Sequence, residues 1–257
     1  MAYATHSGPI AIAHRGGAAL APENTLAAFG RAVALGLRYL ETDVRLTRDE
    51  QLVCFHDATI DRVSDGRGPV GRHTAEELRA VRVGGEPICT LAEALAAFPR
   101  TRFTIDVKEP AAVDALAAVI RDPAVARRVC AAGAWDGQLA RLRELAPDVH
   151  TALGWRTLTT LVGCSRARVR VPQWVRRAAY AHVPVRLGRL PVFADRLVPG
   201  AHAHGIKVIV WTVDDPPTMH RLLDAGVDGI ISDRPDLLRE VFLSRGLWHP
   251  MGEGARA

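Results

Sequence analysis

The sequence predicts a parallel (β/α)8 barrel, the TIM-barrel fold of the α/β class, and three observations lead to this prediction. The chain has 257 residues, of which 48% are hydrophobic, and this suits one domain of barrel size. Short apolar segments of strand length alternate with segments of helical length along most of the chain. Polar residues gather where several apolar segments end, as they do at the carboxyl ends of barrel strands. We therefore expect one domain over residues 1–257.

The predicted strands are short, apolar and spaced as in a barrel. They cover residues 10–14, 39–45, 102–108, 127–132, 149–154, 179–184, 207–213 and 229–232. The first predicted helix starts with the motif PENT at residues 22–25, carries Leu26, Phe29 and Val33 on one face, and stops at Gly36. The other predicted helices cover residues 90–98, 111–121, 136–146, 195–204, 216–225 and 235–244. We expect residues 155–178 to hold a helix and an irregular segment, and residues 249–257 to form a frayed tail.

The segment from Tyr39 to Asp57 is predicted to be a hairpin. Glu41 and Asp43 are two residues apart in a strand, so they share one face. The polar residues 48–51 predict a reversal, which would return His56 to the neighbourhood of Asp43. The following residues, 58–89, lose the regular hydrophobic period and are rich in glycine. They predict a small insertion after the second strand and its hairpin, with a short helix near 74–80.

The composition limits the classes of function. The net charge is +5 and the pI is near 9.4, which is compatible with phosphate esters or an anionic lipid surface as partners. No apolar run approaches the roughly 20 residues that span a bilayer, and the N-terminal residues do not resemble a signal peptide. The cysteines lie far apart without a CxxC motif, which predicts reduced, buried thiols in a cytoplasmic protein.

Charged side chains interrupt several predicted strands near their carboxyl ends. An ion pair in the core would explain one such charge, but charges at matching ends of four or more strands indicate an active site. The charged residues concerned are His14, Arg15, Glu41, Asp43, His56, Asp106 and Lys108. The last two predicted strands also end in polar residues, Asp214 after one and Ser232 and Asp233 in the other.

The types of these residues fit metal-assisted attack at phosphorus. Glu41, Asp43 and Asp106 offer only oxygen ligands, which suit Mg²⁺ or Ca²⁺ better than zinc. His14 and His56 can exchange a proton near neutral pH, as an acid/base pair requires. The two roles cannot be assigned to one histidine or the other from the sequence.

Two further cations and one aromatic residue complete the predicted site. Arg15 and Lys108 can neutralise a phosphoryl oxygen beside the metal. Lys108 is one of only two lysines in a chain whose other cations are arginines, and the two residue types differ as phosphate partners. Trp211 either forms an apolar wall for the substrate or fills the top of the barrel.

Seven motifs, in the same order along the chain, resemble those of the glycerophosphodiester phosphodiesterases. They are HRGG at 14–17, PENT at 22–25, ETDV at 41–44, FHDATIDRVSDGRGPV at 55–70, DVK at 106–108, VWTVDD at 210–215 and GIISDRPDLL at 229–238. The match covers nearly the whole chain apart from residues 109–178, and its HRG, ExD and HD elements are specific in combination. The resemblance implies a TIM barrel in which the insertion covers part of the active-site mouth.

The resemblance also implies a role for each predicted site residue. The three acidic residues would bind a divalent cation, Ca²⁺ or Mg²⁺, the two histidines would act as general base and acid, and the two cations would contact the phosphate. The implied reaction is hydrolysis of a glycerophosphodiester to an alcohol and sn-glycerol 3-phosphate. In this family the glycerol hydroxyl of the substrate is thought to attack phosphorus, giving a cyclic phosphate that water opens.

Two positions depart from the family pattern. Asp106 stands where the family usually has glutamate, and its shorter side chain leaves open whether it binds the metal directly or through water. Asp214 stands where asparagine is common and adds a negative charge near the rim of the site. Neither change removes the histidine pair, so we expect a small-molecule phosphodiester as the partner and no nucleic acid.

Two alternative functions remain open. One is a lysophospholipase D that acts at a membrane, for which residues 166–177, RARVRVPQWVRR, would contact anionic lipid; a solvated edge or loop explains the same segment. The other is a catalytically silent barrel that only binds phosphodiesters or a protein partner. Both histidines are present, which speaks against the silent barrel because binding alone needs no acid/base pair.

Overall fold

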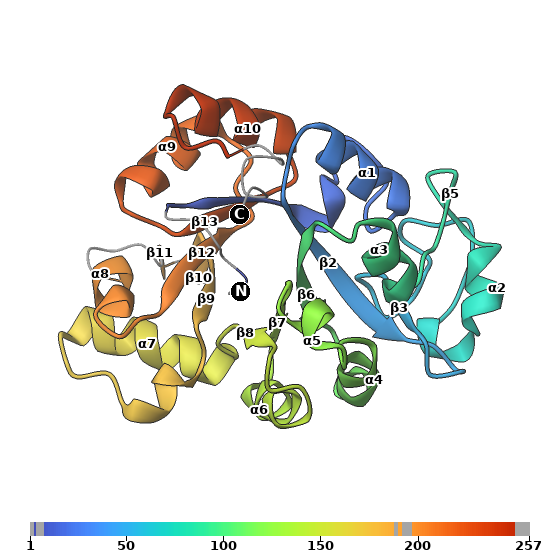
Figure 1. Ribbon diagram of the computed structural model, residues 1–257, viewed down its shortest axis with the longest axis horizontal. Helices are drawn as coiled ribbons and strands as arrows, with labels where there is room; N and C mark the ends of the chain where they lie inside the picture. Colours follow the sequence, from blue (N-terminus) through green and yellow to red (C-terminus); the bar gives the residue numbers. More distant parts are fainter. Residues whose placement is uncertain (1–2, 4–7, 188–189, 192–196, 250–257) are drawn as a thin grey trace.

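The central sheet of the computed structural model, which describes residues 3, 8–187, 190–191 and 197–249, contains eight parallel strands around one axis (Figure 1). They are β1 (Ile10–Ala13), β2 (Tyr39–Leu46), β6 (Arg102–Val107), β7 (Val129–Gly133), β8 (His150–Thr151), β9 (Tyr180–Pro184), β12 (Lys207–Trp211) and β13 (Gly229–Ser232). Their order in the sheet is β8-β7-β6-β2-β1-β13-β12-β9. A parallel bridge between Ala152 and Tyr180 joins the two ends, so the barrel is nearly closed.

The alternation of side chains along the strands sorts them into an inner and an outer layer. Ile10, Ile12 and Tyr39 belong to a buried cluster inside the barrel. Residues of the other parity on the same strands, such as Leu40, pack outward in the core that lies against the helices. Glu41 and Asp43 share the parity of Tyr39, so the strand directs both carboxylates into the barrel.

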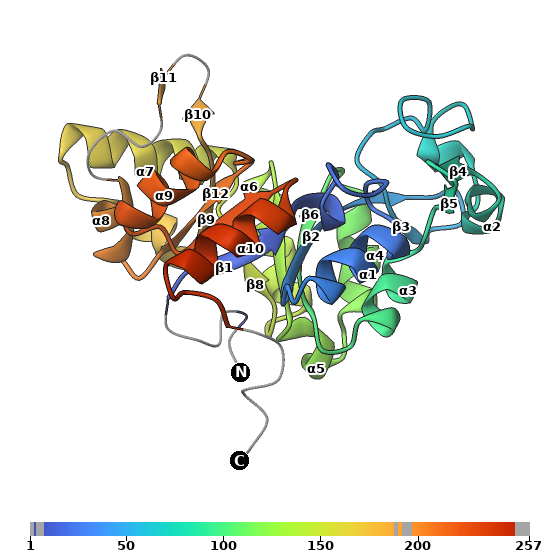
Figure 2. The same cartoon turned by 90° about the horizontal axis from the view of Figure 1, so that it is seen from above.

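Helices cover the outside of the barrel (Figures 1 and 2). They are α1 (Leu26–Ala34), α3 (Leu91–Ala97), α4 (Ala112–Val119), α5 (Pro123–Ala126), α6 (Asp136–Leu145), α7 (Trp155–Ala167), α8 (Leu197–His202), α9 (Pro216–Asp224) and α10 (Pro235–Ser244). The short helix α5 was not predicted, because a single turn gives no periodic signal. The predicted helix at 195–204 lies partly outside the described residues, as does most of the predicted tail at 249–257.

The predicted hairpin is present. β3 (Leu52–Cys54) pairs antiparallel with β2, with Leu46 opposite Leu52 and Val44 opposite Cys54. The residues that follow β3 contain a one-turn 3-10 helix (Val70–Arg72), α2 (Ala75–Arg79) and the two short strands β4 (Arg82–Val83) and β5 (Glu86–Pro87). This segment has a small core of its own and projects to one side of the barrel (Figure 2).

Several predicted strands are longer than the real ones. The predicted strand 149–154 is the two-residue β8, and 207–213 ends as β12 at Trp211. Residues 155–178 contain α7 and then a 3-10 helix (Gln173–Arg177), in agreement with the expectation of a helix and an irregular segment. The described part of the chain contains no helix that is long and apolar enough to cross a membrane.

Candidate active site

The motif HRGG forms a single 3-10 turn (His14–Gly16) directly after β1. Gly16 and Gly17 both have positive φ, 83° and 99°, and a Cβ at Gly17 would lie 2.6 Å from a side-chain atom of Pro235. Only glycine fits this close approach without strain. The turn also holds Arg15 at φ 50°, and the backbone N–H of Arg15 donates to Glu41 Oε2 at 2.9 Å.

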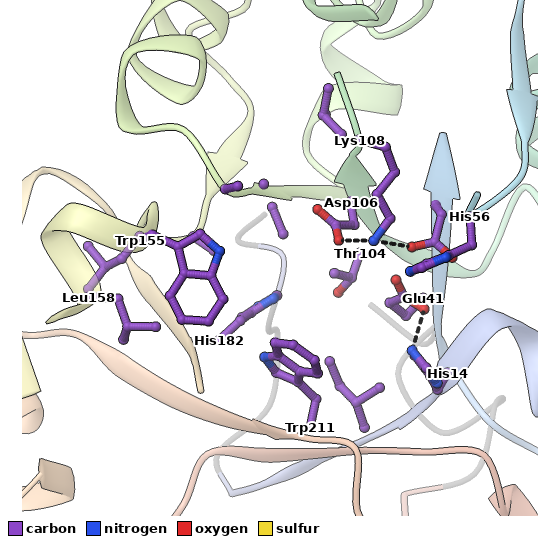
Figure 3. A pocket seen from close by; sticks show the side chains of 18 of the residues that line it. His14, Glu41, His56, Thr104, Asp106, Lys108, Trp155, Leu158, His182 and Trp211 are labelled. Carbon is purple, nitrogen blue, oxygen red and sulfur yellow. Dashed lines mark hydrogen bonds and ion pairs between the residues drawn. The ribbon is translucent and has the colours of Figure 1, made fainter. Parts of the chain in front are cut away.

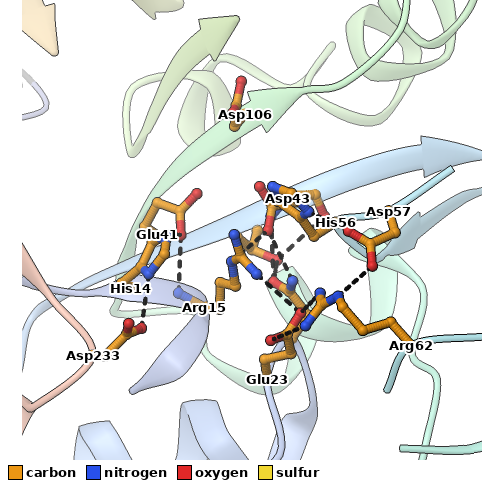
Figure 4. Close-up of polar contacts among 12 residues, drawn as sticks. His14, Arg15, Glu23, Glu41, Asp43, His56, Asp57, Arg62, Asp106 and Asp233 are labelled. Atoms are coloured by element: carbon orange, nitrogen blue, oxygen red, sulfur yellow. Dashed lines mark hydrogen bonds and ion pairs between the residues drawn. The ribbon is translucent and has the colours of Figure 1, made fainter. Parts of the chain in front are cut away.

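His14 lies between two carboxylates. Its Nδ1 is 2.8 Å from Asp233 Oδ1, and its Nε2 is 3.9 Å from Glu41 Oε2 (Figure 4). Burial by itself would lower the pKa of His14, but the negative charges of Glu41 and Asp233 outweigh it and the pKa is raised. Since Asp233 fixes Nδ1 as a donor, Nε2 is left to exchange a proton with a ligand.

Asp43 is buried and surrounded by donors. Lys108 Nζ lies 2.8 Å from its Oδ1, and the side-chain amide of Asn24 donates to its Oδ2 at 2.9 Å. Arg15 Nε is 3.2 Å from the same Oδ2. Burial would raise the pKa of Asp43, but Lys108 and Arg15 lower it, so the carboxylate is charged. The cap of helix α1 is the neighbouring Thr25, whose hydroxyl accepts from the N–H of Ala28.

Glu41 is the least neutralised acid of the site. Burial and the neighbouring charge of Asp43 raise its pKa to about 7. Lys108 instead bridges the other two acids, with Nζ 2.6 Å from Asp106 Oδ2. Within the described ranges no three His, Cys, Asp or Glu side chains already form a metal-binding cluster. The chemistry of the donors nevertheless fits a hard cation, because all three are carboxylates that line one cavity.

His56 follows the hairpin strand β3 and has its own carboxylate partner. His56 Nδ1 lies 2.6 Å from Asp57 Oδ1, and Arg62 holds the other oxygen of Asp57. Partial burial would raise the pKa of Asp57, but hydrogen bonds with Arg62 and His56 lower it to about 2. The backbone carbonyl of His56 accepts two hydrogen bonds from Arg45, at 3.1 and 3.0 Å. The imidazole is therefore oriented through both its ring and its main chain.

One cavity of about 280 Å³ collects every residue that the sequence singled out for the site. These residues are His14, Arg15, Glu41, Asp43, His56, Asp106, Lys108 and Trp211. The sequence did not single out Trp135, Trp155 or His182, but these three also line the cavity. Figure 3 shows Trp155 and His182 among the lining residues. Asp214 accepts hydrogen bonds from Ser232 and from the N–H of Asp233, so it supports the carboxylate that holds His14.

A comparison of the chain with models of protein families identifies one family that has the same motifs. The model of the glycerophosphoryl diester phosphodiesterase family matches residues 14–237, from the first catalytic candidate to the beginning of α10. The chain belongs to this family. The resemblance recognised in the sequence is thereby confirmed.

Relatives and solved structures of the phosphodiesterase family match nearly the full length of the chain. The Mycobacterium tuberculosis protein named probable glycerophosphodiester phosphodiesterase 2 is 39% identical, over 95% of this chain and 94% of its own. The glycerophosphodiester phosphodiesterase of Caldanaerobacter subterraneus subsp. tengcongensis is 33% identical, over 89% and 96%.

Two solved structures share the fold. The glycerophosphodiester phosphodiesterase of Agrobacterium tumefaciens is 25% identical, with a TM-score of 0.74 over 90% of this chain and 99% of its own. An Oleispira antarctica phosphodiesterase, solved with its product sn-glycerol-3-phosphate, is 23% identical, with a TM-score of 0.73 over 91% and 97%. The predicted (β/α)8 barrel is therefore confirmed.

Proposed function

We propose that the protein hydrolyses glycerophosphodiesters to an alcohol and sn-glycerol 3-phosphate, with the help of a divalent cation. The observation that carries this proposal is that His14 and His56 line one carboxylate-rich cavity. Each has an aspartate partner, Asp233 for His14 and Asp57 for His56 (Figure 4). The names of the relatives, glycerophosphodiester phosphodiesterases, support the same reaction.

The two histidines supply the proton transfers. One removes the proton of the attacking glycerol hydroxyl while the other protonates the oxygen of the departing alcohol, which leaves a cyclic phosphate. Water then opens this cyclic phosphate to sn-glycerol 3-phosphate, and the histidines exchange their roles. Each imidazole has its Nδ1 bound to an aspartate, so each keeps Nε2 for the substrate. The positive charges of Arg15 and Lys108 beside Asp43 would bind the phosphoryl oxygens and fix the diester between the histidines.

The divalent cation, Mg²⁺ or Ca²⁺, would be held by Glu41, Asp43 and Asp106. When bound, it would supply positive charge that stabilises the negative oxygens of the phosphoryl group. The raised pKa of Glu41 supports this assignment, because a cation beside Glu41 would offset the burial and the charge of Asp43 that raise it. Asp106 is paired with Lys108, so of the three carboxylates it would bind the divalent cation least directly.

The test is release of sn-glycerol 3-phosphate from glycerophosphocholine and glycerophosphoethanolamine, with added Mg²⁺ or Ca²⁺ and with EDTA. We expect activity that EDTA abolishes and that His56→Ala lowers about 10²- to 10⁴-fold. His204→Ala is a matched control, because His204 does not line the cavity. Tight binding of a diester, measured by calorimetry, without turnover under any metal would instead support the silent barrel.

A lysophospholipase D activity at an anionic membrane is the second candidate. It draws on residues 166–177, where Val169 is 57% exposed and Trp174 is 41% exposed among arginines. Such apolar side chains beside cations suit the surface of an anionic bilayer. Sedimentation with phosphatidylglycerol vesicles at low salt, together with hydrolysis of a lysophospholipid, would favour this candidate. Failure to sediment would argue against it.

A further inference from the structure

The active-site cavity has two chemically different halves. The charged half contains the histidines, the carboxylates and the two cations that have been described. The other half, which we call the aromatic half, is lined by Trp135, Trp155, Leu158, His182 and Trp211. In Figure 3 the labelled residues of the aromatic half lie across the cavity from Glu41, His56 and Lys108. The carboxylates of the cavity lining are Glu41, Asp43 and Asp106, and Lys108 pairs with the last two.

His182 is the polar side chain that the aromatic half provides. It lies on β9, and its Nε2 is buried without a hydrogen-bond partner among the described residues. Burial lowers the pKa of His182 to about 4, so the ring is neutral at pH 7 and does not repel a cation.

The two arms of a glycerophosphodiester differ in what they need from the protein. The glycerol arm carries two free hydroxyl groups, which lose free energy when they are buried without partners. The charged half offers many donors and acceptors around Asp43 and Glu41, whereas the aromatic half offers one imidazole and the indole N–H groups. The glycerol arm therefore fits the charged half, and the second alcohol of the diester fits the aromatic half.

We propose that the aromatic half selects a quaternary ammonium headgroup, so that the preferred substrate is glycerophosphocholine. This inference rests on the proposed function. The faces of Trp135, Trp155 and Trp211 can attract a cation through their negative π-electron density. A trimethylammonium group has no N–H to satisfy, so it loses little when it leaves water for a pocket that has few acceptors.

Other headgroups fit the aromatic half less well. The ammonium of ethanolamine has three N–H donors, for which the aromatic half offers one neutral imidazole, while Lys108 already pairs with Asp43 and Asp106. A polyol such as inositol would bury several hydroxyl groups against the same surface. The whole cavity of about 280 Å³ lies just below the usual range for ligand pockets, roughly 300–1,000 Å³, so it suits a small headgroup.

The test compares kcat/KM for glycerophosphocholine and glycerophosphoethanolamine. We expect the wild-type protein to prefer the choline diester by about fivefold to 30-fold, the effect of a cation–π contact. Trp155→Leu should bring the ratio close to one, and Trp155→Phe should keep part of it. Trp174→Leu is the matched control, because Trp174 is 41% exposed where Trp155 is 42% exposed, but it lies outside this cavity. The control should keep the wild-type ratio.

A binding measurement separates this inference from the proposed function. Tetramethylammonium should change the tryptophan fluorescence of the wild-type protein, ammonium at the same concentration should not, and Trp155→Leu should weaken the response. Equal kcat/KM for both diesters would overturn the headgroup preference while leaving the hydrolysis in place. If no diester is hydrolysed, the proposed function fails, and absence of a tetramethylammonium response would then overturn the headgroup inference independently.

Discussion

Asn24 organises several polar groups of the site with one amide side chain. It is 2% exposed and has φ 58°, a left-handed conformation that asparagine tolerates better than most residues. Its Oδ1 accepts hydrogen bonds from Thr42 Oγ1, at 2.7 Å, and from the N–H of Asp43, at 3.3 Å, while its Nδ2 donates to Asp43. The amide therefore holds the carboxylate of Asp43 in one orientation.

Substitution of Asn24 should reduce both stability and activity. Asn24→Gly keeps the left-handed backbone accessible but leaves buried polar atoms of Asp43 and Thr42 without partners, which costs about 1–3 kcal/mol of the free energy of unfolding. Asn24→Ala should cost a further ~1 kcal/mol because alanine is strained at this φ. Urea denaturation of both variants measures these differences. A glycine variant as stable as the wild type would show that the amide contributes no net stability.

At the scale of an element, the β2–β3 hairpin positions His56, the proposed catalytic histidine, through its backbone. Arg45 on β2 donates two hydrogen bonds to the carbonyl of His56, and its Nη1 is 3.6 Å from Glu109. Glu109 in turn accepts the N–H of Leu46 at 2.7 Å. Arg45 thus joins the main chain of His56 to Glu109, in the chain after β6. This makes Arg45 a positioning residue.

Arg45→Met should lower kcat more than it changes KM. Without the guanidinium the His56 carbonyl loses both donors, and a displacement of the imidazole by about 1 Å can lower the rate by up to about 10²-fold. Arg45→Lys should restore part of kcat. The steady-state kinetics of release of sn-glycerol 3-phosphate measure both effects. Arg48→Met is the control, because Arg48 lies in the same hairpin but pairs with Glu77 at the surface; an equal loss of kcat there would contradict the positioning role.

At the scale of the whole molecule, His182 links the stability of the barrel to pH. Its folded pKa is about 4 because it is buried, whereas the unfolded chain has the ordinary value of 6.5. Between these values the unfolded state binds more protons than the folded state, so acid favours unfolding. The contribution of His182 to the free energy of unfolding is fully present above pH 6.5 and is lost as the pH falls toward 4.

His182→Gln should therefore flatten the acid side of the stability curve. Across this pH window the wild type should lose up to about 3 kcal/mol through this group, and the glutamine variant should not. Urea denaturation at several pH values between 4 and 7 measures the difference. His202→Gln, at an exposed helix end, is the control. Parallel pH curves for wild type and His182→Gln would contradict the assignment.

Local patterns in the sequence predicted much of the barrel and the charged half of the cavity. Alternation along Tyr39–Asp43 placed two carboxylates on one face, and the reversal after β2 predicted the approach of His56, because both signals act within one hairpin. The helix α5 was not predicted and the strand β8 was predicted too long, since a few residues give no period. The chemical roles of the site residues remain predictions for the proposed experiments.

The sequence by itself determined the family, the fold and the set of charged residues that converge, because these depend on short motifs and on regular spacing. Only the tertiary structure showed which residues lie across the cavity from these charged side chains and which carboxylate pairs with His14. His14 meets Asp233 across 219 positions of sequence, and closure of the barrel brings Trp155 from α7 and His182 from β9 to the same cavity. An isolated tryptophan or histidine is compatible with a core, a surface or a site, and its neighbours across the barrel determine which of these it belongs to.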